Sequence, residues 1–226
     1  MKWGIFCFTS GKTSDRVRCI SKTWGKNLDN LYYFTDTDVY KDNVIKCTND
    51  NSYESNVEKN LYAMKYAQEN DFDWSFFVGD DVYIYINNLL SYIETLDSKE
   101  TKAYGEILTG TWPEDLELSY LCGGGGMLFP KVSLDKFVEC MEDPDSYRDY
   151  KYADVVIGLI MKEAGIDMGR ASTFFAAHLK RSIINGNAPE FYRITKPERY
   201  TSFHFINTEE QFKKLWSRDE ANRDNK

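Results

Sequence analysis

The sequence is poor in histidine and proline, and it has no long apolar run. Its 226 residues include two histidines, five prolines and five cysteines. A membrane-spanning helix would need about 20 successive apolar residues. No such run, no signal peptide and no Asn-x-Ser/Thr acceptor occurs. The odd set of cysteines also lacks the paired spacing of a metal site. These absences predict a cytoplasmic protein with free thiols, or a domain excised from a longer chain.

Positive charge is scarce as well. The chain carries 28 Lys and Arg against 36 Asp and Glu, which gives a net charge of −8 and a pI near 4.9. An acidic chain of this kind is a poor candidate for binding a polyphosphate backbone, so no nucleic-acid partner is expected. If the protein binds a diphosphate, a cation must offset the repulsion.

The first half of the chain alternates between strand and helix patterns. Apolar runs predict strands at 3–8, 31–34, 44–47 and 74–78, and helical spacing predicts helices over 14–24, over 56–69 and from about Asn87 or Asn88 to 96. This alternation is typical of an α/β fold with a mixed, mostly parallel central sheet flanked by helices. We expect a single domain over residues 1–216, followed by a charged, frayed tail at 217–226.

The second half is less regular. A strand is predicted at 104–108, a polar excursion at 109–119 and a strand at 127–130 after a run of four glycines. Helices are predicted over 134–141, from about 152 onward, and over 208–216. Between the last two helices, residues 199–205 have a β-like pattern that ends near His204.

The central stretch is residues 73–83. Its apolar strand ends on Gly79, Asp80 and Asp81. Carboxylates at the carboxyl end of a buried strand lie where open α/β sheets place their ligands. Two adjacent acids repel each other unless a cation joins them, and oxygen ligands suit Mg²⁺ or Mn²⁺. The alternative is a strand-to-turn junction with two solvated acids.

Four other polar residues are candidates for contacting a nucleotide. Asp36 and Asp38 follow the second strand and could reach a ribose, although acids at such positions more often cap or turn the chain. Thr9 and Arg16 lie on the loop and helix after the first strand. The Gly-Lys-Thr triplet at 11–13 is not a P-loop, because that motif requires glycine where Phe6 stands.

Three further positions each allow a structural and a functional interpretation. The glycine run, which contains Gly124 and Gly125, favours close approach to a bound sugar or diphosphate over a flexible linker. Asp154 opens a helix and could complement the helix dipole or serve as a catalytic base. A lone histidine such as His204 is more often a structural residue than a ligand.

Taken together, six segments resemble motifs of one family in the same chain order. The family is the Fringe-like β-1,3-glycosyltransferases, which include the core 1 galactosyltransferases. The similar segments are residues 16–26, 33–36, 74–83, 123–128, 153–158 and 202–204. Each motif is weak alone, but six in order across most of the chain identify the family.

The resemblance implies a GT-A fold and transfer of a hexose-type sugar from a UDP-sugar, with Mn²⁺ or Mg²⁺ and inversion at the anomeric carbon. The acceptor would be a hydroxyl of a glycan or glycoprotein. By the same resemblance, Asp81 is the chief metal ligand and His204 completes the metal site. Asp80 lies beside them, near the ribose or the metal-bound water, and Asp154 is the general base.

Two departures from the family pattern matter. Gly79 replaces the first acid of the family's acidic triplet, so Asp36 or Asp38 would have to substitute for a carboxylate that reaches the uridine or ribose. Ala153 replaces the acid before the base. The chain also lacks the stem and disulfides of Golgi members. It therefore resembles a compact bacterial or viral version, an excised catalytic domain or a virus-encoded enzyme of the host cytoplasm.

Two other classes of function remain open. A nucleotide-sugar hydrolase or nucleotidyltransferase could share Asp80 and Asp81, but it would gain nothing from a Ser-Phe-His segment or from a base at Asp154. A non-catalytic carbohydrate-binding module could use the abundant aromatic residues. Most of those residues, however, fall on inward faces and are expected in the core.

Overall fold

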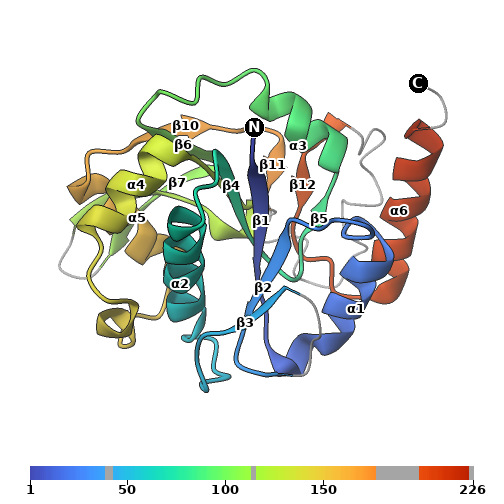
Figure 1. Cartoon of the computed structure of the whole chain (residues 1–226), viewed down its shortest axis with the longest axis horizontal. Coiled ribbons are helices and arrows are strands. Elements are labelled where there is room, and N and C mark those ends of the chain that lie inside the picture. The colour runs from blue at the N-terminus through green and yellow to red at the C-terminus, as the bar shows by residue number, and fades with distance from the viewer. Residues whose placement is uncertain (39–42, 113–115, 177–198, 224–226) are drawn as a thin grey trace.

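The structure, a computed structural model, describes residues 1–38, 43–112, 116–176 and 199–223. Its centre is a seven-stranded sheet with the strand order β10-β6-β9-β4-β1-β2-β3 (Figure 1). The strands are β1 (Trp3–Phe8), β2 (Leu31–Thr35), β3 (Val44–Lys46), β4 (Trp74–Gly79), β6 (Lys102–Gly105), β9 (Met127–Pro130) and β10 (Asp167–Arg170). Only β9 runs antiparallel to its neighbours, β4 and β6. The predicted mixed, mostly parallel sheet is confirmed.

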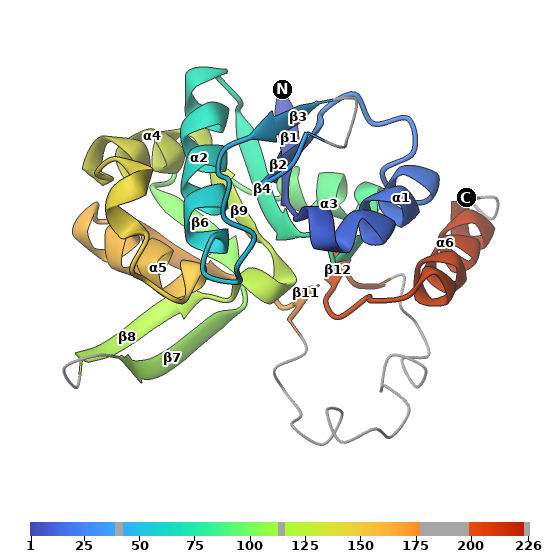
Figure 2. The same ribbon diagram turned by 90° about the horizontal axis from the view of Figure 1, so that it is seen from below.

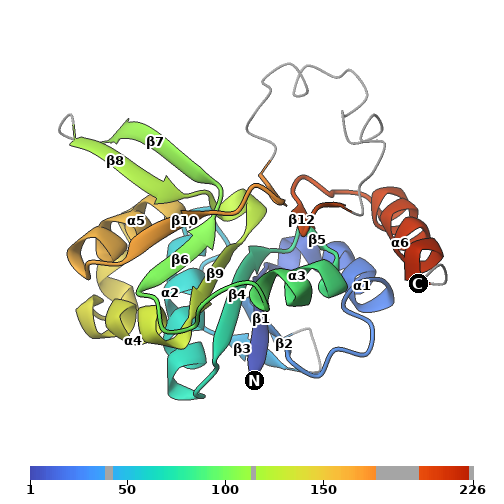
Figure 3. The ribbon, with the colours of Figure 1, turned by 90° about the horizontal axis from the view of Figure 1, so that it is seen from above.

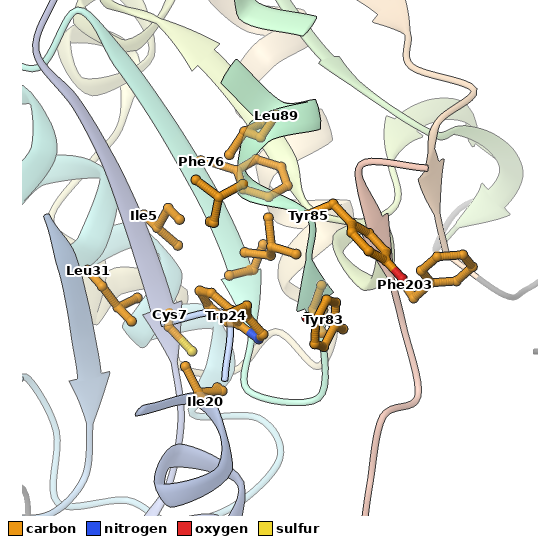
Figure 4. Close-up of a cluster of buried hydrophobic side chains, with 14 of the residues drawn as sticks. Ile5, Cys7, Ile20, Trp24, Leu31, Phe76, Tyr83, Tyr85, Leu89 and Phe203 are labelled. Atoms are coloured by element: carbon orange, nitrogen blue, oxygen red, sulfur yellow. The ribbon is translucent and has the colours of Figure 1, made fainter. Parts of the chain in front are cut away.

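Helices cover both faces of this sheet. One face carries α1 (Ser14–Lys22), α3 (Ile86–Ile93) and α6 (Glu209–Arg223), and the other carries α2 (Asn56–Glu69), α4 (Lys131–Cys140) and α5 (Ala153–Glu163). Alternate residues of a strand point to opposite faces, so Ile5 and Cys7 join the first core while Phe6 joins the second. Figure 4 shows the first core, with Trp24 and Phe76 among its large side chains. None of the described helices is long and apolar enough to cross a membrane.

The strand register brings three chain segments to one edge of the sheet. Phe8, the last residue of β1, pairs with Phe34 of β2 and with Gly79 of β4. The chain therefore leaves all three parallel strands at the same edge, which Figure 2 shows from below. Because β2 and β4 lie on opposite sides of β1, this edge is a topological switch point, where open α/β sheets form their ligand crevices.

A second, small sheet brings a distant segment to this edge. It consists of β11 (Phe174–Phe175), β12 (Ser202–Phe203) and β5 (Tyr83–Ile84), in that order. Phe203 pairs with Tyr83 in an antiparallel register, and the amide of Ile206 donates a hydrogen bond to the carbonyl oxygen of Asp81 at 2.9 Å. His204, near the end of the chain, thus lies beside Asp81.

Three sequence predictions about elements were wrong. The strand predicted at 104–108 is divided, because β6 ends at Gly105 and a separate strand begins at Ile107. The predicted polar excursion at 109–119 belongs largely to a hairpin of β7 (Ile107–Trp112) and β8 (Leu116–Leu121), which extends beyond α5 in Figure 3. Leu118 and Tyr120 form the buried face of this hairpin and pack against Val155 of α5. The last helix does not end at 216 but continues as α6 to Arg223, and residues 224–226 of the predicted tail lie outside the described part.

Candidate active site

A cleft of about 360 Å³ opens at the carboxyl edge of β1 and β4. Such a volume lies within the range of small-ligand sites. Four groups of residues line it: the loop after β1 and the start of α1, the segment that leads into α2, the end of β4, and the glycine run with the start of α5. His204 completes the lining. The cleft therefore gathers Thr9, Arg16, Asp80, Asp81, Gly124, Asp154 and His204, seven of the ten residues predicted to form a site.

Asp80 is buried at the base of this cleft, and both of its carboxylate oxygens are occupied. Oδ1 accepts a hydrogen bond from Arg16 Nη1 at 2.9 Å, and Oδ2 accepts hydrogen bonds from the hydroxyls of Thr9 at 2.6 Å and of Thr13. Burial raises the pKa of Asp80, although the two threonines and Arg16 oppose that shift. The Asp80 oxygens therefore join β4, the β1 loop and α1, and its role as a metal ligand stays a prediction.

Asp81 makes a different contact. Its Oδ2 lies 3.3 Å from Nε2 of His204. Burial raises the pKa of Asp81, but the hydrogen bond and charge of His204 outweigh burial and hold it below the ordinary value. Conversely, desolvation lowers the pKa of His204, and Asp81 more than reverses that effect, so the net shift is upward. Each side chain thus favours the charged form of the other on the wall of the cleft.

The tautomer of His204 follows from its other ring nitrogen. Nδ1 lies 3.0 Å from the carbonyl oxygen of Ala176, and a carbonyl oxygen can only accept, so Nδ1 carries a proton. Nε2 is then the atom that can offer a lone pair to a cation. A backbone carbonyl that fixes one ring nitrogen is a usual partner of a metal-binding histidine.

The residues present fit a divalent cation only in part. Asp81 Oδ2 and His204 Nε2 are adjacent and have the donor chemistry that Mn²⁺ accepts. Within the described residues, no three His, Cys, Asp or Glu side chains come together as a metal site. A cation held by Asp81 and His204 would need its remaining ligands from water and substrate phosphates, as is usual for Mg²⁺ at phosphate-binding sites.

The glycine run allows the His204 ring to pack closely against its backbone. A Cβ on Gly124 would lie 2.4 Å from Nδ1 of His204, and one on Gly126 would lie 2.5 Å from the ring of Phe76. Gly125 is buried, and its carbonyl oxygen accepts a hydrogen bond from the Ser202 hydroxyl at 2.5 Å. The group that approaches Gly124 closely is thus a histidine ring, and the predicted approach of a sugar or diphosphate to the glycine run stays a prediction. Gly125, predicted to contact the donor, does not line the cleft.

Asp154 is the second residue of α5 and lines the cleft. Its Oδ1 accepts a hydrogen bond from the Val155 amide at 3.1 Å. The nearest atom to a Cβ built on Gly123 is the Cβ of Asp154, 3.8 Å away. Asp154 thus lies in the same cleft as Asp81 and His204, at a helix start where a carboxylate is electrostatically favoured.

The structure does not bring Asp36 and Asp38 to the cleft wall. Asp36 is buried, and its oxygens accept hydrogen bonds from the Gly11 amide at 2.9 Å and from Lys59 Nζ at 3.0 Å. Asp38 is exposed and pairs with Lys46 at 3.2 Å. One carboxylate is thus used inside the fold and the other lies on the surface, so neither lines the cleft in this structure.

The prediction from sequence missed several residues that line the cleft. Lys12, Thr13, Tyr53, Lys59 and Asn60 all contribute to its wall. Lys12 stands in the Gly-Lys-Thr triplet that fails as a P-loop, so a signal for it was present. Lys59 gives no such signal, since a lysine on a helix is normally exposed, whereas this side chain is only 1% exposed.

Comparisons with known proteins agree with this geometry. The model of the Fringe-like family matches residues 8–211. A β-1,3-glucosyltransferase of Mus musculus is 23% identical over 73% of this chain and 34% of its own length, so the chain spans about a third of that relative.

Two solved structures share the fold over 96% of this chain. The first is a glycosyltransferase involved in the glycosylation of the major capsid of PBCV-1, with a TM-score of 0.52, 12% identity and 100% of its own chain covered. The second is the glycosyltransferase GlyE of Streptococcus pneumoniae TIGR4, with a TM-score of 0.50, 11% identity and 62% of its chain covered. The predicted GT-A fold is confirmed. Because the family model matches nearly the whole chain, this protein belongs to the Fringe-like family.

Proposed function

We propose that this protein is a metal-dependent inverting glycosyltransferase that moves a hexose-type sugar from a UDP-sugar to a hydroxyl of a glycan or glycoprotein. One observation carries the proposal: a single cleft at the switch point of the sheet contains the Asp81–His204 pair, cationic side chains and the carboxylate of Asp154. The family membership and the glycosyltransferases of the same fold support it.

The part of the cleft that carries cationic side chains suits the diphosphate of a UDP-sugar. Lys12, Arg16 and Lys59 line it, although the whole chain has a net charge of −8. Arg16 is engaged by Asp80 and Lys59 by Asp36, whereas Lys12 Nζ donates to the uncharged carbonyl oxygen of Asn51 at 3.0 Å. Lys12 is therefore the cation best able to meet a phosphate. Asp81 and His204 would hold a divalent cation, which would offset the charge of the leaving diphosphate.

Asp154 is the residue proposed to take the proton of the acceptor hydroxyl. Glycosyl transfer with a single base and no covalent intermediate inverts the anomeric carbon, because the acceptor oxygen attacks the face opposite the leaving diphosphate. The base must then lie across the cleft from the group that holds the diphosphate. Asp154 lies on α5 and Lys12 in the turn between β1 and α1, so the two residues reach the cleft from different segments of the chain.

The proposal is tested by calorimetric titration of UDP into the protein with and without Mn²⁺, for the wild type, Asp81→Ala and Asp15→Ala. Asp15 is an acid on the exposed side of α1 whose side chain is 84% exposed, so it serves as the control. We expect Mn²⁺-dependent binding in the wild type and in Asp15→Ala, and its loss in Asp81→Ala. Absence of UDP binding under both conditions would refute the proposal.

The same preparation separates the alternatives. A hydrolase would release the sugar from a UDP-sugar at a rate that acceptors do not raise, and a nucleotidyltransferase would consume a nucleoside triphosphate. A binding module would need neither the metal nor UDP. The proposed transferase instead predicts that an added acceptor raises UDP release and appears in the product.

A further inference from the structure

Exposed aromatic side chains lie in or directly beside the chain segments that line the cleft. Among the described residues, the large apolar side chains that are exposed are Met1, Tyr53, Tyr150, Tyr152 and Phe205. Tyr53 lines the cleft itself, Tyr152 directly precedes the cleft residues Ala153 and Asp154, and Phe205 directly follows His204. Nearly all the other large aromatic residues of the described chain are packed in the two cores or partly covered, so this gathering is not explained by folding.

Tyr53 is the most exposed of these aromatic residues, with 62% of its surface accessible. Its backbone is fixed, because its carbonyl oxygen accepts a hydrogen bond from the Asn56 amide at 3.1 Å at the entry to α2. The Tyr53 side chain lines the same cleft as Asp154, and desolvation and the charge of Asp154 raise the pKa of its hydroxyl. A fixed backbone with an exposed ring is suited to contact with a ligand.

Phe205 is held beside the cleft residue His204 by a strained backbone. Its φ angle is +61°, which a bulky side chain seldom adopts. The amide of His204 donates to the carbonyl oxygen of Phe175 at 3.1 Å, and the amide of Ile206 donates to Asp81, so both flanks are fixed. The Phe205 ring stacks on the ring of His204 with centroids 3.8 Å apart and remains 43% exposed.

Polar groups accompany these rings. Asn51, Ser52, Asn56 and Asn60 line the cleft on the Tyr53 side. The Oδ1 atom of Asn60 is buried and accepts no hydrogen bond from the described residues, although buried polar atoms normally have a partner. Aromatic faces beside amide and hydroxyl groups suit a saccharide, whose C–H faces pack on rings while its hydroxyls bond to amides. A lipid would instead require a continuous apolar surface.

We propose that Tyr53 and Phe205, bordered by Tyr152, form the acceptor subsite, and that the acceptor bound there is a saccharide whose ring stacks on them. This inference rests on the proposed transferase function and specifies the class of acceptor. A peptide hydroxyl is the alternative outcome of the test. Lys151 Nζ lies 5.5 Å from the centre of the Tyr152 ring, so Tyr152 is assigned only to the border.

The test compares Tyr53→Ala with Tyr53→Phe and with Tyr150→Ala. Tyr150 is a matched control, because it is 45% exposed but packs beside Tyr147 and does not line the cleft. The first readout is saccharide binding without donor, measured by a glycan array and by saturation-transfer NMR with the saccharides that the array selects. The second readout is UDP affinity with Mn²⁺, and the third is the KM for the selected saccharide.

We expect Tyr53→Ala to weaken saccharide binding and raise the acceptor KM at least about tenfold, which corresponds to about 1.4 kcal/mol. Its UDP affinity should stay within about twofold of the wild type, by the same free-energy relation, and Tyr53→Phe and Tyr150→Ala should keep wild-type saccharide binding. The inference is overturned if no saccharide binds the wild type, if Tyr53→Ala binds saccharides unchanged, or if only peptide hydroxyls are modified. If the wild type does not bind UDP, the proposed function is refuted. The measurement of saccharide binding by the wild type and Tyr53→Ala still tests this inference.

Discussion

Asp80 and Asp81 are neighbours in the sequence but have different partners. Asp80 is bound by two threonine hydroxyls and a guanidinium, whereas Asp81 faces a histidine across the cleft wall. When Asp80 loses its charge, the guanidinium of Arg16 stays charged and loses a partner. When Asp81 loses its charge, His204 can release its proton. The two acids should therefore differ in what their removal costs.

We predict that Asp80→Asn lowers the free energy of unfolding by about 2 kcal/mol, because one partner of a mostly buried ion pair is removed. Asp81→Asn should change it by less than about 1 kcal/mol while abolishing Mn²⁺-dependent UDP binding. Urea unfolding monitored by tryptophan fluorescence measures the first effect, and calorimetry measures the second. Equal destabilisation by both variants would contradict this division of roles.

The buried pair of Asp36 and Lys59 leads to a pH prediction. Burial raises the pKa of Asp36, but hydrogen bonds from Gly11 and Ser10 and the charge of Lys59 outweigh it, so the pKa lies below its ordinary value of 3.8. A lowered pKa in the folded state means that the ionised carboxylate stabilises the fold above about pH 4, and that this stabilisation is lost as the pH falls through the folded-state pKa.

Asp36→Asn should therefore lower the free energy of unfolding by about 3 kcal/mol near pH 7. The gap in unfolding free energy between wild type and variant should narrow as the pH falls from about 5 to 3. Urea unfolding at several pH values measures this gap. The isosteric amide preserves the size of the side chain, so packing does not account for the change. A gap that stays constant over the whole range would contradict the assignment.

Some of these residue roles were accessible from sequence and others were not. The apolar run before Asp80 and Asp81 predicts a strand end, and strand ends meet at a switch point, so the position of the site could be foreseen. The sequence could not show which of the two acids accepts hydrogen bonds from other segments, because the donors Thr9, Thr13 and Arg16 lie more than 60 residues away. The partner of Asp36 was equally hidden, since nothing local marks Lys59 as buried.

At the scale of elements, the glycine run, β12 and His204 act together. Gly124→Ala should push against the His204 ring, because the added Cβ would lie 2.4 Å from Nδ1. We expect this substitution to disturb the hydrogen bond to Ala176 and to weaken metal-dependent UDP binding at least about tenfold, or about 1.4 kcal/mol. Calorimetric titration of UDP with Mn²⁺ measures the effect.

Gly165→Ala is the matched control for that substitution. Gly165 has a φ of +65° and no atom within 4 Å of the added Cβ, so the change should cost about 1 kcal/mol of stability through backbone strain alone. Its UDP binding should equal that of the wild type. If Gly124→Ala also binds UDP as the wild type does, the glycine run does not serve to position His204.

The elements that sequence patterns located well are those with strong apolar periodicity. The α2 helix has the predicted bounds of 56–69, and β4 lies where the buried run indicated. The hairpin of β7 and β8 was missed because its strands alternate with Thr, Ser and Glu, and its apolar side is completed only by α5. The length of α6 was underestimated because its final turns are charged and lack an apolar stripe.

At the scale of the whole molecule, an acidic protein presents a cleft that contains three cationic side chains. Without a metal, the net charge of −8 opposes the approach of a diphosphate. Lys12→Ala should therefore weaken UDP binding about tenfold even with Mn²⁺ present, since a charge-assisted hydrogen bond contributes about 1.5 kcal/mol.

Calorimetry at two salt concentrations tests this prediction. The salt dependence of UDP binding should be smaller for Lys12→Ala than for the wild type, because screening then acts on one charge fewer. Lys46, which pairs with Asp38 on the surface, provides the control Lys46→Ala with unchanged affinity. An unchanged affinity in Lys12→Ala as well would show that the diphosphate is not bound at this wall of the cleft.

The most direct test of the account is the rate of sugar transfer by Asp154→Asn. Wild type and variant are incubated with Mn²⁺, a UDP-sugar and the acceptor that supports turnover, and both UDP release and the glycosylated product are measured. The account predicts that Asp154→Asn binds UDP with Mn²⁺ as tightly as the wild type but transfers sugar about 10²- to 10⁴-fold more slowly, because a general base has been removed. Transfer at the wild-type rate by this variant would contradict the proposed reaction at this site.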